Sequence, residues 1–193
     1  GAIHQYLAKP CDPDELCRAI KLVEDTGTQL RSPPLKSLVL GLPQGTALTD
    51  PAMTHLGELA ALQRLVLDIP ALDDRVAGEL AALTGLRELD LGGTQISDVG
   101  LKALAGMRGL RVLKLHHTRV THRGLMHLAA LTQLGVPELE HTAVGDGGVA
   151  YLKDLTALRV LRLDSTLITD QALAHLRGMT RLEQLNLAGT VVT

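Results

Sequence analysis

LRELDLGGTQISDVGLKALAGMRG, residues 86–109, is a unit of 24 residues that most of the chain repeats. Further full copies begin at residues 62, 110, 134 and 158, a stretched copy of 27 residues spans 35–61, and a cut copy begins at residue 182. We number these copies as repeats 1 to 7 in chain order. A fixed period of this length indicates a stacked solenoid, in which each unit packs only against its neighbours.

The unit has two halves that differ in the spacing of their apolar residues. In the first half Leu89 and Leu91 alternate with polar residues, as expected for a strand with one buried face. In the second half Leu101, Leu104 and Met107 recur every three residues, which indicates a short helix. Neither half buries its apolar side alone, so stacking should join the leucine rows of successive repeats into one core.

Polar residues at fixed places in the unit predict how its turns are held. Ser97 and Asp98 stand where the helix needs an N-cap, and their oxygens suit the free amides of its first turn. A threonine recurs between two inward apolar positions, as Thr94, Thr118, Thr142, Thr166 and Thr190. We expect this threonine to be buried, with its hydroxyl bonded to the backbone of the neighbouring turn in a ladder along the stack.

The strand half, LxxLxLxxTxI, resembles the leucine-rich repeat signature, with Thr at the place usually held by Asn or Cys. The resemblance covers residues 35–193, in about seven repeats of which the last is truncated. It implies an α/β leucine-rich repeat solenoid, or horseshoe, with a parallel sheet on the concave side and short helices on the convex side. This fold hosts many unrelated partners, so the resemblance does not name one.

Residues 1–24 lie outside the repeat pattern, and residues 25–34 are a predicted linker containing Gly, Ser, Thr and Pro. GAIHQYLAKP predicts a short strand, and DPDELCRAIKLVE predicts a helix capped by Asp12. The segment QYLAKPCDPDELCRAI is similar to the last strand and helix of response-regulator receiver domains. That resemblance implies that Lys9 contacts a phosphoryl group and that the Lys9–Pro10 bond is cis.

A receiver also needs an acidic pair and a phosphoacceptor aspartate, which would have to lie upstream of Gly1. The alternative is that residues 1–24 form a strand–helix element that caps the solenoid. Because the chain begins with Gly and stops at Thr193, where the next helix should start, we expect a fragment cut at both ends.

Composition limits the classes of function. Phe and Trp are absent, so the core must be aliphatic. The formal net charge of -2, without a basic cluster, argues against nucleic acid as a partner. No apolar run is long enough to span a membrane, and no signal peptide is visible. Cys11 and Cys17 lack the spacing of metal ligands, and their expected reduced state favours a cytoplasmic location.

Outward strand positions should line the concave face. The middle row contains Asp90, Lys114, Glu138 and Arg162, which predicts an alternating charge ladder across adjacent strands. Self-neutralisation of a solvated face explains this alternation, and docking of a protein partner is the functional alternative. Docking would also use the flanking row, which contains His116, Glu140 and Asp164.

The histidines of the flanking row invite two further hypotheses, which we set aside. Adjacent histidines such as His116 and His117 should point to opposite faces of a strand, so we expect no metal site. No nucleophile accompanies the His and Asp residues, and no glycine-rich phosphate loop follows a strand. We therefore expect no enzyme activity and no cofactor.

Repeat 5 departs most from the pattern. Pro137 replaces an inward leucine and removes a backbone donor, and four glycines loosen both halves of the unit: Gly145, Gly147, Gly148 and Gly135. We expect it to be the least stable repeat. A hinge and the accumulation of changes without selection both remain possible reasons.

The sequence thus favours a non-catalytic scaffold for protein–protein interaction, as an output or binding arm in bacterial-type signalling. The alternative is a truncated two-component response regulator controlled by phosphorylation of an aspartate upstream of the chain. An enzyme built on the concave face is the third hypothesis, and it requires turnover that depends on His116 or Asp164.

Overall fold

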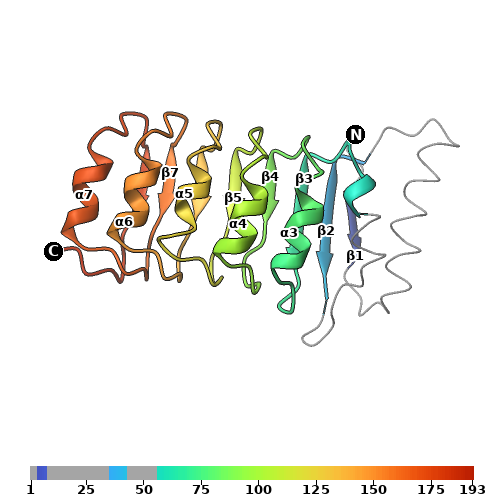
Figure 1. The fold of residues 1–193 in the computed structure, drawn as a ribbon, viewed down its shortest axis with the longest axis horizontal. Coiled ribbons are helices and arrows are strands. Elements are labelled where there is room, and N and C mark those ends of the chain that lie inside the picture. Colours follow the sequence, from blue (N-terminus) through green and yellow to red (C-terminus); the bar gives the residue numbers. More distant parts are fainter. Residues whose placement is uncertain (1–3, 8–34, 43–55) are drawn as a thin grey trace, which may run out of the picture.

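The computed structural model describes residues 4–7, 35–42 and 56–193. These residues contain an eight-stranded parallel sheet in which the strands lie side by side in chain order (Figure 1). The strands are β1 (His4–Leu7), β2 (Ser37–Gly41), β3 (Arg64–Asp68), β4 (Glu88–Asp90), β5 (Val112–Lys114), β6 (Val136–Glu138), β7 (Val160–Arg162) and β8 (Gln184–Asn186). The register advances by one repeat at each step, as in Leu65 beside Leu89 and Leu89 beside Leu113.

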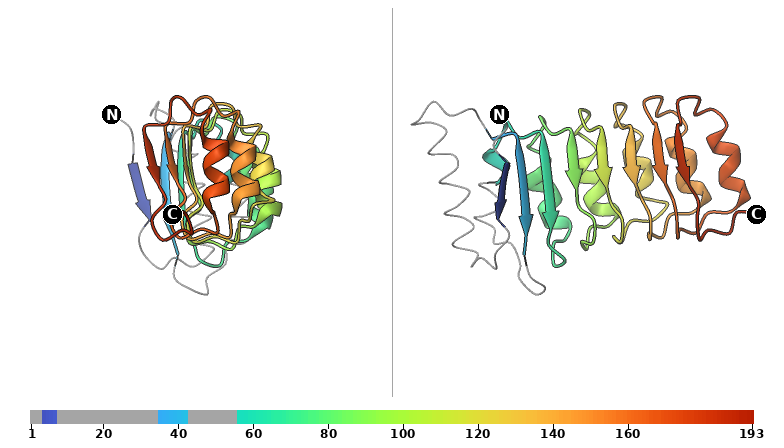
Figure 2. Two further views of the ribbon diagram at one scale, coloured as in Figure 1. Left: turned by 90° about the vertical axis from the view of Figure 1, so that its left-hand side faces the viewer. Right: turned by 180° about the vertical axis from the view of Figure 1, so that it is seen from behind.

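Short helices cover one face of the sheet and leave the other open (Figure 2). They are α3 (Asp74–Leu80), α4 (Asp98–Leu104), α5 (Leu125–Leu128), α6 (Asp146–Val149) with the 3-10 turn η1 (Ala150–Leu152), and α7 (Asp170–Leu176). The strand–turn–helix unit and its solenoid stacking are therefore confirmed. Within the described ranges no helix is both long and apolar enough to cross a membrane.

The N-terminal element is described only in part. β1 confirms the short strand expected within residues 1–10, and it pairs in parallel with β2, so that it extends the repeat sheet by one strand. The helix expected after Asp12, the linker of residues 25–34, and Lys9 with Pro10 lie outside the described residues.

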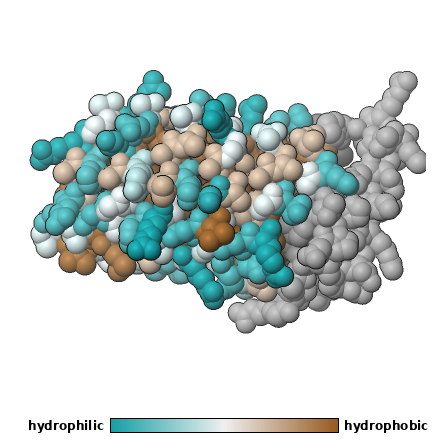
Figure 3. All heavy atoms as spheres, viewed as in Figure 1, coloured by the Kyte–Doolittle hydropathy of each residue, from teal (hydrophilic) through white to brown (hydrophobic). Residues whose placement is uncertain are grey.

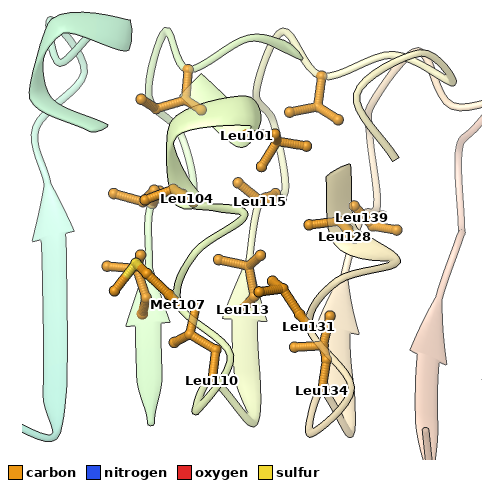
Figure 4. Close-up of a cluster of buried hydrophobic side chains, with 14 of the residues drawn as sticks. Leu101, Leu104, Met107, Leu110, Leu113, Leu115, Leu128, Leu131, Leu134 and Leu139 are labelled. Carbon is orange, nitrogen blue, oxygen red and sulfur yellow. The ribbon is translucent and has the colours of Figure 1, made fainter. Parts of the chain in front are cut away.

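The core is a continuous stack of aliphatic rows between the sheet and the helices. Leu89, Leu113 and Leu161 of the strands are fully buried, as are Leu101 and Leu104 of α4. Figure 4 shows leucines of α4 and α5, which belong to repeats 3 and 4, lying among Leu113, Leu115 and Leu139 from the strand halves of repeats 4 and 5. Each row continues into the next repeat, so that burial in one unit depends on its neighbours.

The recurring threonine is buried as expected, but its predicted partner is wrong. Thr94 is 1% exposed, and its hydroxyl donates to the carbonyl of Leu91 at 2.7 Å, within its own turn. Thr118 donates in the same way to Leu115, three residues earlier. The turn that ends each strand brings this carbonyl within reach, so the hydroxyl closes its own turn and forms no ladder along the stack.

A ladder along the stack does exist, and aspartates at the helix starts make it. Asp98 accepts hydrogen bonds from both the amide and the hydroxyl of Thr121 in the next repeat, at 2.8 and 2.7 Å. We call this pair of bonds the Asp clamp. The same clamp joins Asp74 to Ser97, Asp146 to Thr169 and Asp170 to Thr193.

The caps of the helices share residues with the clamps. Ser97 and Thr169 accept a bond from the amide two residues on, which confirms Ser97 as the N-cap of α4. Asp98 therefore acts less as a cap for its own helix than as an acceptor for the following repeat. The clamp also requires close approach, because a Cβ on Gly100 would lie 2.6 Å from Oδ1 of Asp74.

One junction lacks both halves of the clamp. Repeat 4 has His122 where repeats 2, 3, 5 and 6 have aspartate, and repeat 5 has Gly145 where repeats 3, 4, 6 and 7 have Ser or Thr. Gly145, the N-cap residue of α6, accordingly provides no side-chain cap. The helix side of repeat 5 is thus held to repeat 4 by fewer polar bonds than the neighbouring repeats.

The strand side of repeat 5 is also weakened. The amides of Leu115 and Leu139 donate to carbonyls of the next repeat, at 2.8 and 3.0 Å. Pro137 stands two residues before Leu139 and has no amide hydrogen to offer. The pairing of β6 with β7 is reduced to the single register pair of Glu138 with Arg162, whereas β5 pairs with β6 over three residues.

We predict that Leu113→Ala lowers the free energy of unfolding by about 2–5 kcal/mol, because the side chain leaves a cavity in a closed aliphatic core. Chemical denaturation of the purified chain measures this change. Val112→Ala is the control, because the neighbouring Val112 is only half-buried on the open face. An unchanged midpoint for Leu113→Ala would contradict the inward position of this row.

Amide hydrogen exchange should find repeat 5 less protected than repeats 4 and 6. Repeat 5 lacks the Asp clamp to repeat 4 and the backbone amide hydrogen at Pro137. Both losses lower the free energy needed to open this repeat locally. Exchange measured by mass spectrometry on peptides from residues 110–181 separates the three repeats. Equal protection across them would mean that leucine packing alone sets local stability.

Restoring the clamp at its empty junction should stabilise the chain. Gly145 has extended backbone angles, and a Cβ there would meet its nearest atom at 3.7 Å, so Thr fits. We expect His122→Asp and Gly145→Thr together to exceed the sum of the single variants by about 1–2 kcal/mol, because the bond from the hydroxyl to the carboxylate needs both substitutions, whereas the amide of residue 145 can bond to the new carboxylate in His122→Asp alone. Denaturation of the four proteins in this double-mutant cycle tests it, and strict additivity would refute the role of the clamp.

Candidate functional site

The open side of the sheet, opposite the helices, carries three rows of side chains, and we call it the sheet face (Figure 2). Alternate residues of a strand point to the same side, and the common register aligns them across strands. The valine row is Val112, Val136 and Val160. The charge row is Asp90, Lys114, Glu138, Arg162 and Asn186. The flanking row, two residues further along each strand, is Asp68, Gly92, His116, Glu140 and Asp164.

The centre of the charge row forms the expected ladder. Lys114 Nζ lies 3.5 Å from Glu138 Oε2, and Arg162 Nη1 lies 3.9 Å from Glu138 Oε1. Glu138 is only 8% exposed, because both cations and the neighbouring strands cover it. The carboxylate of repeat 5 thus sits between cations from repeats 4 and 6.

The prediction that the charge ladder includes Asp90 is wrong. Asp90 lies beside Lys114 in the register, yet its Oδ1 accepts a hydrogen bond from the amide of Gly92 in its own turn, at 3.0 Å. Asn186 makes the same local bond with Ala188, and its amide group also donates to Asp164 at 2.8 Å. A short carboxylate or amide at this place turns toward its own backbone, whereas the longer Glu138 reaches across strands.

Glu140 in the flanking row is the least satisfied group of the sheet face. Its Oε1 lies 3.9 Å from the same Arg162 Nη1 that faces Glu138. Its Oε2 is inaccessible to solvent and has no hydrogen-bond partner. Sequence reasoning placed Glu140 in the right row but gave no signal of this burial, which follows from the length of the surrounding side chains.

The histidines lie differently from the prediction. The strand has ended before His117, which takes a left-handed φ of 54°, so the two adjacent rings do not diverge to opposite faces. The ring centroids of His116 and His117 are 5.8 Å apart, and those of His117 and His141 stack at 4.2 Å. His116 lies directly over the backbone of Gly92, where a Cβ would overlap its imidazole.

This left-handed position recurs in the turns of repeats 3, 5, 6 and 7. Gly93, His141, Ser165 and Gly189 occupy it with φ between 55° and 74°, where the bounds are those of Ser165 and Gly93. Glycine is the usual residue for such a turn, and His is among the residues that tolerate it. Stacking of His117 on His141 is therefore a consequence of turn geometry repeated at the spacing of the strands.

The arrangement offers no metal centre within the described residues, where no three His, Cys, Asp or Glu side chains converge on one point. Before β7 and β8, an exposed ion pair joins Arg159 to Glu183 of the next repeat, with Nε 2.8 Å from Oε1. The hydrogen bonds that Arg159 donates to Glu183, and then the charge of that carboxylate, raise the pKa of Arg159 above its ordinary value. What the sheet face can do is present fixed polar and apolar groups to another molecule.

Comparison with known proteins agrees with this architecture. A family model described as Leucine Rich repeat matches residues 83–105. The crystal structure of internalin C2 from Listeria monocytogenes superimposes with a TM-score of 0.68 and 30% sequence identity, over 82% of this chain and 64% of the internalin chain. The fold is a leucine-rich repeat solenoid. The chain spans less than two thirds of the internalin C2 chain.

Other leucine-rich repeat structures are similar at lower identity. An internalin, inlF, from Listeria monocytogenes has 22% identity and a TM-score of 0.48, over 82% of this chain and 56% of its own. The leucine-rich repeat ectodomain of the receptor kinase SOBIR1 from Arabidopsis thaliana has 19% identity and a TM-score of 0.43, over 62% and 68%. A search of curated protein sequences gives no match.

Proposed function

We propose that the chain is a non-catalytic scaffold that binds a protein partner through the sheet face. One observation supports this most directly: three rows of side chains keep a common register across repeats 3 to 6, on the side that none of the described helices covers. Stacked repeats create extended binding surfaces of this kind, and their rigidity lowers the entropic cost of ordering the contact residues. The site consists of Asp90, Lys114, Glu138, Arg162, His116, Glu140 and Asp164.

Charge favours protein over nucleic acid as this partner. Five carboxylates lie in the charge and flanking rows, against the two cations Lys114 and Arg162. A phosphate backbone would be repelled by such a face, because its binding depends on clustered Lys and Arg. A catalytic role would need a nucleophile at His116, whose ring instead lies against the Gly92 backbone and beside His117.

We further propose that the chain serves as an output or binding arm in signalling, on the strength of the YLAKP segment alone. Pairing of β1 with β2 supports the alternative in which residues 1–24 cap the repeat sheet. Control by phosphorylation, contact of Lys9 with a phosphoryl group and a cytoplasmic location stay predictions.

Affinity capture with matched variants tests the binding role. Arg162→Ala removes a half-exposed cation from the sheet face, and Arg123→Ala removes an exposed cation from the opposite side, just before α5. We expect a protein captured by the wild-type chain from a lysate of its own organism to be recovered at least about tenfold less with Arg162→Ala, as for a contact near the centre of an interface.

Arg123→Ala should capture this protein as the wild type does. Both variants should still unfold cooperatively, and Arg162→Ala should lower the midpoint because it removes a cation beside the nearly buried Glu138. A partner lost equally with both variants, or with Arg123→Ala alone, would place the binding surface elsewhere and overturn the assignment to the sheet face.

A further inference from the structure

The sheet face is apolar along one row and acidic along another, and we propose that its partner is a protein segment carrying a lysine or arginine together with an aliphatic side chain. The cation would sit on Glu140, and the aliphatic side chain would lie on the valine row. This inference rests on the proposed binding function and adds the chemistry of the partner.

The first support is the charge balance around Glu138 and Glu140. Two nearly buried carboxylates share Arg162, whose Nη1 lies 3.9 Å from an oxygen of each, beyond hydrogen-bonding distance. Lys114 serves Glu138 alone, at 3.5 Å. Asp164 nearby receives only the neutral amide of Asn186. The two cations thus face three carboxylates, and Asp164 has no cation of its own within the described residues.

The second support is the oxygen of Glu140 that has no partner. A buried acceptor without a hydrogen bond is costly, and native structures leave few of them. Oε2 of Glu140 is such an atom, and its side chain is 14% exposed, so a small movement opens it to the sheet face. An ammonium or guanidinium group supplies the donors and the charge that this oxygen lacks.

The third support is the valine row. Val112, Val136 and Val160 are half-buried side chains on the open side of three adjacent strands, with no helix of the described chain above them. Glu88 and Gln184 flank this row on either side. An apolar strip bounded by polar residues is the usual form of an interface core with a polar rim.

The geometry sets the spacing of the two groups in the partner. Val136 begins β6, and Glu140 lies four positions later, in the turn that follows Glu138. A fully extended backbone would separate them by about 13 Å, and the turn shortens this distance. A partner segment lying extended along the strands would need its aliphatic and cationic residues about four positions apart. A folded partner would present them at the same distance from neighbouring elements.

Other occupants fit these rows less well. A bound metal ion would need a convergent set of ligands, which the described residues do not provide. An acidic segment would meet Asp164, which lacks a cation, and Glu140, which shares Arg162 with Glu138. The helix side carries exposed apolar side chains as well (Figure 3). Val99 of α4 is 67% exposed. Nothing in the structure pairs these side chains with a charge that would define a partner.

Panning a phage library of random short peptides on the immobilised full chain tests the inference. We expect enriched peptides to combine Lys or Arg with Val, Ile or Leu at the stated spacing. Binding of a synthetic copy of the strongest peptide should weaken about tenfold in Glu140→Gln, which keeps the shape and removes the charge. It should weaken less, by about threefold, in Val136→Thr, which adds a hydroxyl to the strip.

The matched controls lie on the helix side. Asp154→Asn removes a carboxylate there, and Val99→Thr adds a hydroxyl to an exposed valine of α4. Both should bind the peptide as the wild type does, and all four variants should keep the wild-type denaturation midpoint.

The outcomes separate the two proposals. Two results would overturn the inference of a cationic partner and leave the sheet face as the binding surface. The enriched peptides could be acidic, or their binding could be unchanged in Glu140→Gln and weakened in Arg162→Ala. Peptides that respond to the helix-side controls and to no sheet-face variant would overturn the proposed function itself. A library that enriches no sequence would overturn the inference that a short cationic segment suffices.

Discussion

Each repeat of this chain is held by bonds that only its neighbour can make. The carbonyl of Arg87 accepts from the amides of both Arg111 and Val112 in the next repeat, and the pattern recurs at each later junction. The Asp clamps do the same on the helix side, where one carboxylate satisfies an amide and a hydroxyl of the following unit. A single unit has neither partner, so its strand and its helix depend on the stack.

This dependence explains why so much of the fold follows from the sequence. Once a period of 24 residues fixes which residues are equivalent, one inward leucine such as Leu89 implies all the others in its row. The same period places Glu138 and Arg162 on adjacent strands, because they stand one repeat apart. What the period cannot reveal is the path of a side chain within its own turn. Thr94 and Asp90 both bond locally, where a ladder between repeats was predicted.

Unlike these local bonds, the Asp clamp could have been predicted from the sequence. An aspartate at one helix start and a Ser or Thr 23 residues later, as in Asp98 and Thr121, occur together at four junctions. They are lost together where His122 precedes Gly145. Joint presence and joint loss indicate a contact. The left-handed turn at His117 could not be predicted in this way. Glycine, as at Gly93, indicates a positive φ in the sequence, whereas histidine at the equivalent position does not.

Two carboxylates of the sheet face lie on the repeat that lacks some of the bonds to both of its neighbours. Glu138 and Glu140 belong to repeat 5. This repeat lacks the Asp clamp to repeat 4, and Pro137 offers no backbone amide hydrogen to repeat 6. The ion pairs of Glu138 with Lys114 and Arg162 partly replace those bonds, since they join repeat 5 to both sides. A ligand that binds only the ordered form of this unit must stabilise it by linkage. Binding of a partner at Glu140 would therefore be coupled to the ordering of repeat 5, so that a weak repeat is compatible with a specific surface.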